Sequence, residues 1–371
     1  MPVYRDDAHK TWYYVVNFYD ASGKRKQKRK RGFNTKKEAT EALRKLEVQF
    51  NEGTYVESKN ISFNQYIEDW LSIKKRSLSN STISLYERSI KNHISPSLGN
   101  TLLSKMKPQH IQKFLIGMHE AGLADASIKR IFNIVNVCLN DAVNFGDLPS
   151  NPAKKVEKPK VLPKEMKIWT VDQIQRFLKC SNYHRMYCIF HLAIMTGLRK
   201  GEILGLLWKN VDLEKQVLYV NQTLETDGKT FKTGAKTKSG VRSVTISPST
   251  KEVLLKHKEQ QNAEREYFAS EYGDLDLVIC AENGAPYHPR NLTRTFNILT
   301  KKAELPHIRF HDLRHTHAAL MIAQNEPMKL IAERLGHSKI TTTMDTYGHL
   351  FPNMQRDASN RLDQTIFGEL D

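Results

Sequence analysis

The chain has 371 residues, 39% hydrophobic and 26% charged, with a formal net charge of +17 at pH 7. This length predicts two or three domains, and the apolar content excludes a chain that is disordered throughout. No apolar run reaches the ~18 residues of a membrane span, and the segment MPVYRDDAHK lacks the apolar core of a signal peptide. The 57 Lys and Arg against 40 Asp and Glu favour nucleic acid as partner, because each neutralised phosphate releases counterions. A merely soluble basic protein, or one that binds an anionic membrane, is the alternative that charge alone leaves open.

The cysteines lack the spacing of a metal site or a disulfide framework. They are Cys138, Cys180, Cys188 and Cys280. We expect reduced thiols in the core of a cytoplasmic protein.

Residues 1–56 predict a small α+β domain, a sheet with one helix packed on it. The segment 12–20 (WYYVVNFYD) is rich in aromatic and β-branched residues and predicts a strand, and the DASG that follows predicts a turn. A second strand carries a run of basic residues, and Thr35 with Glu38 predicts the capped start of a helix over 36–51. Such a run is often a solvated face, but its place between folded segments favours contacts with DNA phosphates. The basic residues are Lys24, Arg25, Lys26, Lys28, Arg29, Lys30 and Arg31.

Residues 61–155 predict a bundle of four amphipathic helices. Apolar residues recur at helical spacing, and Gly or Pro interrupts the pattern between segments. A helical spacer without a function of its own gives the same periodicity. The stretch NPAKKVEKPKVLPKEMK (151–167) is basic, rich in proline and without periodicity, which predicts an exposed linker, placed here at 156–169.

Residues 170–371 predict a mixed, mainly α domain with a small β-sheet. Thr170 is the expected N-cap of its first helix, the apolar helix MYCIFHLAIMTG follows, and a β region (VLYVNQTLE and VRSVTIS) precedes further helices. The whole chain is therefore expected to be a multidomain, mainly α protein.

Two basic residues of this third domain lie where they can reach a phosphate. Arg199 in TGLRKGE follows the apolar helix, where Gly197 permits a turn, and Glu202 is spaced to orient it or to cap the next helix. Lys238 in KTKSGVR lies at the predicted tip of a hairpin and can protonate a leaving oxygen. Lys236 and Arg242 compete for the same role.

The segment HDLRHTHAALMI begins a helix that presents His311 and Arg314 on one face, since they are three residues apart. An imidazole and a guanidinium so placed can contact the same phosphate oxygens. His311 and His315 are four apart, as in some zinc sites, but the residues between them are not those of HExxH. We expect no metal and no cofactor.

Two short helices joined by a Gly-His turn are predicted in PMKLIAERLGHSKITTTMDTYGHLF. One interpretation is a helix-turn-helix with Ser338 as N-cap and Tyr347 in the core. The other places His337 beside a phosphate and leaves Tyr347 free to attack it. A tyrosine with its ordinary pKa of ~10 is a poor nucleophile, so it needs a base or strong electrostatic activation by neighbouring cations.

Two arginines, a lysine and two histidines can grip one phosphodiester, and a tyrosine can break it. The set Arg199, Lys238, His311, Arg314, His337 and Tyr347 resembles the tyrosine recombinase (phage integrase) family in residue type, order and spacing. TGLRKGEILGL, HDLRHTHA and LGHSKITTTMDTYGH are most similar to integrases of temperate phages and integrative conjugative elements of Gram-positive bacteria. The resemblance covers the whole chain as an arm-type DNA-binding domain, a core-binding helical domain and a catalytic domain.

The resemblance implies a mechanism. Arg199 and Arg314 clamp the scissile phosphate, His311 and His337 donate hydrogen bonds to it, and Tyr347 attacks to form a 3′-phosphotyrosyl link. Lys238 then acts as general acid for the 5′-oxygen. No ATP is needed, and exchange through a Holliday junction implies a homotetramer on double-stranded DNA with core and arm attachment sites.

This implied function integrates and excises a mobile element, at the bacterial nucleoid. An accessory DNA-bending or excision factor is a further partner, and the tail after Tyr347 docks either on a neighbouring copy or in cis. Two other classes remain open, a non-catalytic helix-turn-helix regulator and a type IB topoisomerase.

Overall fold

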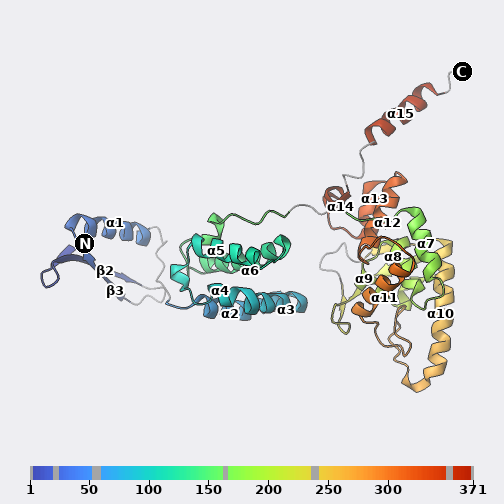
Figure 1. The fold of residues 1–371 in the computed structure, drawn as a ribbon, viewed down its shortest axis with the longest axis horizontal. Coiled ribbons are helices and arrows are strands. Elements are labelled where there is room, and N and C mark those ends of the chain that lie inside the picture. The colour runs from blue at the N-terminus through green and yellow to red at the C-terminus, as the bar shows by residue number, and fades with distance from the viewer. Residues whose placement is uncertain are drawn as a thin grey trace. The chain divides into compact units, whose positions relative to one another are not determined.

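The computed structural model describes residues 3–19, 25–51, 60–161, 166–234, 242–347 and 354–368. The chain divides into two compact units, residues 1–163 and 164–371 (Figure 1). Helices dominate both units, and the described strands form small sheets in the orders β1-β2-β3, β4-β5-β8 and β6-β7. The predicted fold class, mainly α with small sheets, is confirmed.

The first part of the chain is an antiparallel sheet covered by a helix. Strands β1 (Val3–Asp6), β2 (Thr11–Tyr19) and β3 (Arg25–Phe33) form the sheet, and α1 (Lys36–Asn51) packs on it. Alternate residues of β2, Tyr14 and Val16, are buried with Leu43 and Leu46 of α1, as the two-residue period of a strand requires. Strand β1 was not predicted from the sequence.

The start of α1 follows the prediction with one difference. The Thr35 hydroxyl accepts a hydrogen bond from the Glu38 backbone N–H at 3.2 Å, so Thr35 caps the helix. The Glu38 carboxylate accepts from the N–H of Asn34 at 3.1 Å, one residue earlier than in a standard capping box.

The second part is a helical bundle. It contains α2 (Phe63–Lys74), α3 (Asn80–Ser89), a π-helical turn (Ile90–Ile94), α4 (Ser95–Leu98), α5 (Pro108–Glu120) and α6 (Asp125–Asn144). The predicted apolar face of α2 is buried, including Phe63 and Ile67. Trp70 Nε1 and Lys74 Nζ each donate to one oxygen of Asp141 at 2.8 Å, which ties α2 to α6.

The proline-rich stretch after α6 is less exposed than predicted. Ala153 and Val156 are buried in the bundle core around a 3₁₀ turn (Pro152–Lys155), and the Asn151 side chain donates to Asn140 at 2.8 Å. The expectation of an exposed linker is therefore wrong for 151–156, because the frequent lysines hid two apolar contacts. Further along, Trp169 is buried in the core of the second unit.

The second unit is built around an apolar helix. Its helices are α7 (Val171–Ser181), α8 (Tyr187–Thr196), α9 (Lys200–Leu204), α10 (Pro248–Phe268), α11 (Pro289–Lys302), α12 (Asp312–Ala323), α13 (Met328–Leu335), α14 (Ile340–Tyr347) and α15 (Met354–Phe367). Its strands are β4 (Val211–Asp212), β5 (Val217–Val220), β6 (Gln222–Leu224), β7 (Phe231–Thr233) and β8 (Arg242–Thr245). Helix α8 is buried almost throughout because it packs against α7, α9, α10 and α12. Thr170 caps α7, as predicted, and Gln173 completes a capping box that was not predicted.

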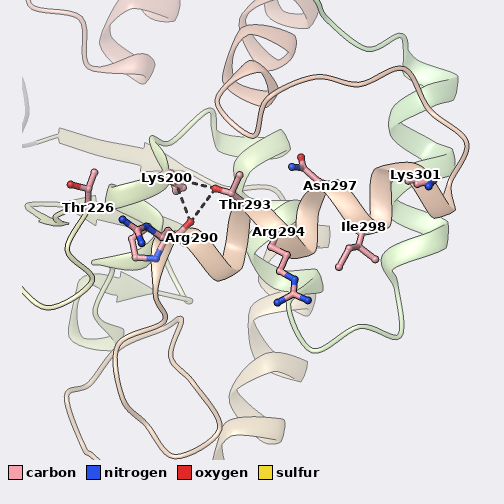
Figure 2. Close-up of a pocket in the computed structure, with 9 residues that line it drawn as sticks. Lys200, Thr226, Arg290, Thr293, Arg294, Asn297, Ile298 and Lys301 are labelled. Atoms are coloured by element: carbon pink, nitrogen blue, oxygen red, sulfur yellow. Dashed lines mark hydrogen bonds between the residues drawn. The ribbon is translucent and has the colours of Figure 1, made fainter. Parts of the chain in front are cut away.

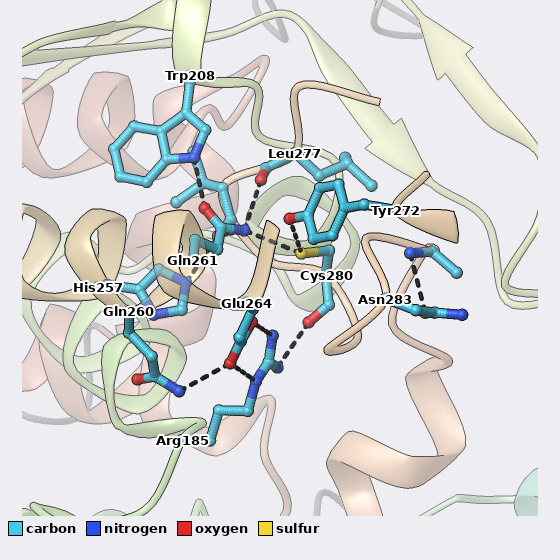
Figure 3. A network of polar contacts seen from close by, with 12 residues as sticks. Arg185, Trp208, His257, Gln260, Gln261, Glu264, Tyr272, Leu277, Cys280 and Asn283 are labelled. Atoms are coloured by element: carbon cyan, nitrogen blue, oxygen red, sulfur yellow. Dashed lines mark hydrogen bonds and ion pairs between the residues drawn. The ribbon is translucent and has the colours of Figure 1, made fainter. Parts of the chain in front are cut away.

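A polar network fixes the segment before α11 on α10 (Figure 3). Arg185 forms a bidentate ion pair with Glu264, both contacts at 2.6 Å, and donates to the Cys280 carbonyl at 2.8 Å. Gln261 accepts from Trp208 Nε1 at 2.7 Å and donates to the Leu277 carbonyl at 3.0 Å. These bonds satisfy polar groups that burial would otherwise make costly.

The cysteines of the described chain are free thiols, three of them buried. No described helix is both long and apolar enough to cross a membrane.

Candidate active site

Arg199 lies at a turn that Gly197 makes possible. Gly197 ends α8 in the left-handed conformation, φ +66°, and a Cβ there would come within 2.6 Å of the His317 ring. Arg199 follows as the N-cap of α9, and its guanidinium donates to Glu202 Oε1 at 2.8 Å and to the Gly336 carbonyl at 3.3 Å. Its side chain stays 42% exposed, so the guanidinium is oriented and still open to a ligand.

Glu202 is the buried carboxylate that organises the arginines. Arg242 at the start of β8 holds it in a bidentate ion pair, at 3.0 and 2.8 Å, and also donates to the Arg334 carbonyl at 2.9 Å. Burial alone would raise the pKa of Glu202, but the hydrogen bonds and charge of Arg242, joined by Arg199, lower it to about 2. Arg242 is therefore a buried ion-pair partner, which argues against it as the mobile general acid that the sequence left open.

Arg314 is buried beside this pair. Its guanidinium donates to the Gly197 carbonyl at 2.8 Å and to the Leu335 carbonyl at 2.5 Å. Burial, together with the positive charge of Arg199, lowers the pKa of Arg314 to about 9. Arg199 and Arg242 thus bond the carboxylate of Glu202, whereas backbone carbonyls hold Arg314, and the excess positive charge favours an anionic ligand.

His337 stands in the turn between α13 and α14. Gly336 adopts φ +68° there, and a Cβ on it would come within 2.7 Å of the Arg242 guanidinium, so the turn and the arginine pack closely. His337 Nδ1 is 2.7 Å from Thr343 Oγ1. Burial and the charges of Arg314 and Arg199 lower the pKa of His337 to about 4, which leaves the ring neutral at pH 7.

These contacts bring Arg199, Arg314 and His337 to one turn, residues 335–337. A pocket of about 430 Å³ opens beside it, and Arg199, Glu202, Lys232 and His337 are among its lining residues. A phosphate in this pocket would meet the guanidinium of Arg199, which Glu202 and the Gly336 carbonyl already orient.

Tyr347 ends α14 and is fully buried, with 0% of its surface exposed. The sequence left open whether Tyr347 lies in the core or is free to move, and its packing against Ala318, Ile331 and Leu335 places it in the core. Burial raises the pKa of Tyr347 to about 12, although Arg314 and Arg199 act in the opposite direction. The hydroxyl therefore needs a general base or electrostatic activation to act as a nucleophile.

That hydroxyl contacts a histidine the sequence analysis considered only as a metal ligand. His315 Nδ1 lies 2.8 Å from Tyr347 Oη. His311 precedes α12 and packs edge to face on His315, with ring centroids 5.1 Å apart. Although part of His311 is exposed, the atoms packed around it, with His315 and Arg314, lower its pKa to about 4. The i, i+4 spacing of His311 and His315 was the available signal, because it predicts two rings on one helix face.

The neighbouring His317 has a structural role. Its Nε2 accepts from Arg334 Nε–H at 3.1 Å, so its Nδ1–H donates to the Ile194 carbonyl at 2.8 Å. Arg334 also donates to the carbonyls of Thr245 and Met195, both at 3.0 Å. Arg334 therefore braces α13 on β8 and α8.

Some predicted residues lie elsewhere. Lys238 and Lys24 fall outside the described residues. On β3, Arg25, Arg29, Lys30 and Arg31 are exposed, while Lys26 and Lys28 are half-buried. The Arg29 guanidinium stacks over the Tyr13 ring, 4.0 Å from its centroid.

A second, larger pocket of about 900 Å³ lies along α11 (Figure 2). Its charged lining residues are Lys200, Arg290, Arg294 and Lys301. Lys200 Nζ donates to Thr293 Oγ1 at 3.3 Å, and burial lowers its pKa. Within the described part of the chain no three His, Cys, Asp or Glu residues gather as a metal site would require.

Comparison with known families identifies three regions. The Phage integrase family matches residues 167–354, an Arm DNA-binding domain matches residues 2–50, and the N-terminal SAM-like domain of phage integrases matches residues 62–119.

Relatives match over most of their length. The ICEBs1 integrase of Bacillus subtilis (strain 168) is 30% identical over 339 residues, which cover 90% of this chain and 91% of that protein. The integrase of Staphylococcus phage L54a is 24% identical, with 87% and 98% covered.

Solved structures share the fold. The Tn1549 transposon integrase in complex with a circular intermediate DNA superposes with a TM-score of 0.70 at 20% identity, covering 81% of this chain and 99% of that one. A λ integrase dimer bound to a COC′ core site gives a TM-score of 0.57 at 18% identity, with 92% and 93% covered.

Proposed function

Because this chain belongs to the phage integrase family and is a tyrosine-type site-specific recombinase, we propose that Tyr347 is its nucleophile and forms a 3′-phosphotyrosyl link to DNA. The observation that carries this is the anchoring of Arg199 and Arg314 to the turn 335–337, on the carbonyls of Gly336 and Leu335. Helix α14 leaves that turn and ends at Tyr347. One short segment therefore joins the phosphate-binding arginines to the nucleophile.

Two arginines and two histidines hold the phosphate in this proposal. Arg199 and Arg314 present N–H donors to its non-bridging oxygens, and His337 and His311 donate further hydrogen bonds from their neutral rings. Preorganised donors stabilise the charge of the pentacoordinate state without a metal ion. Glu202 and Arg242 keep Arg199 in place, because the three side chains form one hydrogen-bonded set.

Lys238 is the proposed general acid for the departing 5′-oxygen. The bond energy stays in the phosphotyrosyl link, so the 5′-hydroxyl of a partner strand can reverse the step without ATP. Two such exchanges pass through a Holliday junction and integrate or excise the element.

Double-stranded DNA is the proposed partner of all parts of the chain. Residues 1–56 form the arm-binding domain, 61–155 the core-binding domain, 156–169 the linker and 170–371 the catalytic domain. The basic exposed face of β3 supports arm-site binding, and the arginine- and lysine-lined pocket on α11 supports backbone contacts near the active site. Four active sites in a homotetramer, with an accessory bending or excision factor, complete the assembly at the bacterial nucleoid.

Covalent trapping tests this proposal. Nicked suicide duplexes, tiled across the DNA that flanks the gene, are incubated with protein in the presence of a chelator and without ATP. Wild type should form a denaturant-resistant adduct on one duplex, and Tyr347→Phe should bind that duplex without forming it. Tyr183→Phe is the matched control, because Tyr183 is 98% exposed, and it should react as wild type.

Other outcomes overturn the proposal. An adduct from Tyr347→Phe would exclude Tyr347 as nucleophile. Adducts on every duplex would indicate a topoisomerase, and tight site-specific binding without adducts would indicate a regulator.

A further inference from the structure

The hydroxyl of Tyr347 is buried and hydrogen-bonded, so its proton needs a defined acceptor. A phenol whose pKa lies well above neutrality attacks a phosphodiester slowly unless a base removes its proton during the attack. The packing of Tyr347 against α12 and α13 excludes bulk water from that role in the described structure. The acceptor of the phenolic proton must therefore be a side chain that contacts Oη.

His315 meets the geometric requirement. Its Nδ1 is 2.8 Å from Tyr347 Oη, within the range for proton transfer, and the two rings are edge to face with centroids 5.7 Å apart. His315 lies on α12 directly after the phosphate-binding Arg314, so the base and the phosphate ligand share one rigid element. The ring of His311, four residues earlier in the chain, packs edge to face against the ring of His315 and so supports it.

We propose that His315 is a catalytic residue, whose Nδ1 accepts the Tyr347 proton as Oη attacks phosphorus. This inference rests on the proposed function of Tyr347. In the step, the Oη–P bond forms, the bond from phosphorus to the 5′-oxygen breaks, and the phenolic proton moves to Nδ1. The 5′-oxygen takes its proton from the separate general acid. On religation the 5′-hydroxyl attacks, and His315 returns its proton to the departing Oη.

The environment of His315 suits a base that is neutral before the reaction. Burial lowers its pKa, Asp312 opposes that change, and Arg314 and Arg309 add to it. The ring is therefore unprotonated at pH 7, and the step requires the tautomer with Nε2–H, in which Nδ1 has a free lone pair. The titratable and charged groups around the ring are His311, Asp312, Arg314, Arg309, His337 and Tyr347.

Two substitutions separate proton transfer from positioning. His315→Ala removes both the base and the hydrogen bond. His315→Asn keeps an oxygen close to the position of Nδ1, so it can still accept the hydrogen bond but cannot take the proton. His307→Asn is the control, because His307 is an exposed histidine just before α12.

The measurement is the single-turnover rate of adduct formation on the suicide duplex between pH 5.5 and 9. Wild type should level off near neutral pH. Both His315 variants should be slower by about 10²-fold or more at pH 7, and their rates should rise about tenfold per pH unit, since tyrosinate must form without a base. The control should follow the wild-type profile.

A merely structural role would lower the rate equally at every pH. A wild-type rate for His315→Asn, with only His315→Ala impaired, would reduce His315 to positioning and overturn the proposal. Wild-type rates for both His315 variants would also overturn the proposal. If adducts still form with Tyr347→Phe, the proposed nucleophile fails; if that variant is inactive while the His315 variants react normally, only the base assignment fails.

A second measurement covers the case in which His315→Ala does not fold. Incorporating 3-fluorotyrosine at position 347 makes the phenol more acidic and so less dependent on a base. The defect of His315→Asn should then shrink. An undiminished defect would contradict proton transfer to His315.

Discussion

Arginines occur in two contrasting settings in this protein. On β3 they lie on the exposed face of a sheet, as Arg29 does over Tyr13, whereas in the second unit Arg314 and Arg242 are buried among carbonyls and the Glu202 carboxylate. Exposed charges are screened by salt and act mainly on affinity. Buried charges are screened little and are held in fixed directions, so they act on the transition state. In the proposed function the same side chain therefore serves binding in one region and catalysis in the other.

The largest expected effect is the loss of cleavage rate when a buried arginine is replaced. Arg314→Lys keeps a positive charge but loses the fork that donates to the carbonyls of Gly197 and Leu335. We expect cleavage to fall by about 10²- to 10³-fold, with site binding nearly unchanged. Single-turnover cleavage and gel-shift titration on the same duplex measure the two quantities.

Arg176→Lys is the matched control for that substitution. Arg176 also donates to a backbone carbonyl, that of Ala303, but it lies on α7. It should cleave at the wild-type rate. Equal losses in the two variants would mean that Arg314 acts through folding.

The next effect concerns stability. Glu202→Gln removes the charge that pairs with Arg242 and Arg199, so the unfolding free energy should fall by about 3 to 5 kcal/mol. The pKa of Glu202 is lowered from 4.5 to about 2 on folding, so the carboxylate stabilises the native state above pH 4.5. That contribution is lost as pH falls from 4.5 through 2.

Urea unfolding of wild type and Glu202→Gln at pH 7 and at pH 3 measures this effect. The difference between the two proteins should narrow at pH 3. A constant difference would show that the carboxylate charge is not the cause.

The sequence predicted features set by neighbouring residues better than features set by contacts between distant segments. Local patterns fixed the helix over 36–51, the cap at Thr35 and the turn at Gly197, because each depends on neighbours in the chain. The strand β1 was missed because its four residues lack a clear alternation and become a strand through pairing with β2.

The candidate site also has features that the sequence could predict and contacts that it could not. Residue type and order were enough to propose Arg199, Arg314, His337 and Tyr347 as site residues. They could not give the burial of Tyr347 or its bond to His315, since that contact joins residues 32 positions apart on different helices. Nor could they show that Arg242 is held by Glu202, which depends on β8 packing beside α9.

For the exposed basic residues of β3 we expect a smaller effect per residue, and it should appear in DNA affinity. Replacing Lys28, Arg29 and Lys30 with Gln should weaken binding to arm-site DNA and lower the slope of log affinity against log salt by about 0.9 for each lost phosphate contact. Cleavage of a core-site duplex should not change, because these residues lie outside the catalytic unit. Fluorescence anisotropy at several salt concentrations measures the slope, and an unchanged slope would remove β3 from the interface.

The smallest expected effect is the uptake of a fraction of a proton when DNA binds. Proton uptake separates the exposed basic residues of β3 from the buried site. Lysines and arginines on β3 are charged throughout the working pH range, so binding through them needs no protons. His337 has a pKa of about 4 in the free protein, and a phosphate beside it would raise that pKa. Binding of core-site DNA at pH 5.5 should therefore take up protons and tighten as pH falls. Calorimetry in buffers of different ionisation enthalpy measures the uptake, which should drop in His337→Asn; equal uptake by that variant would place the protons on other groups.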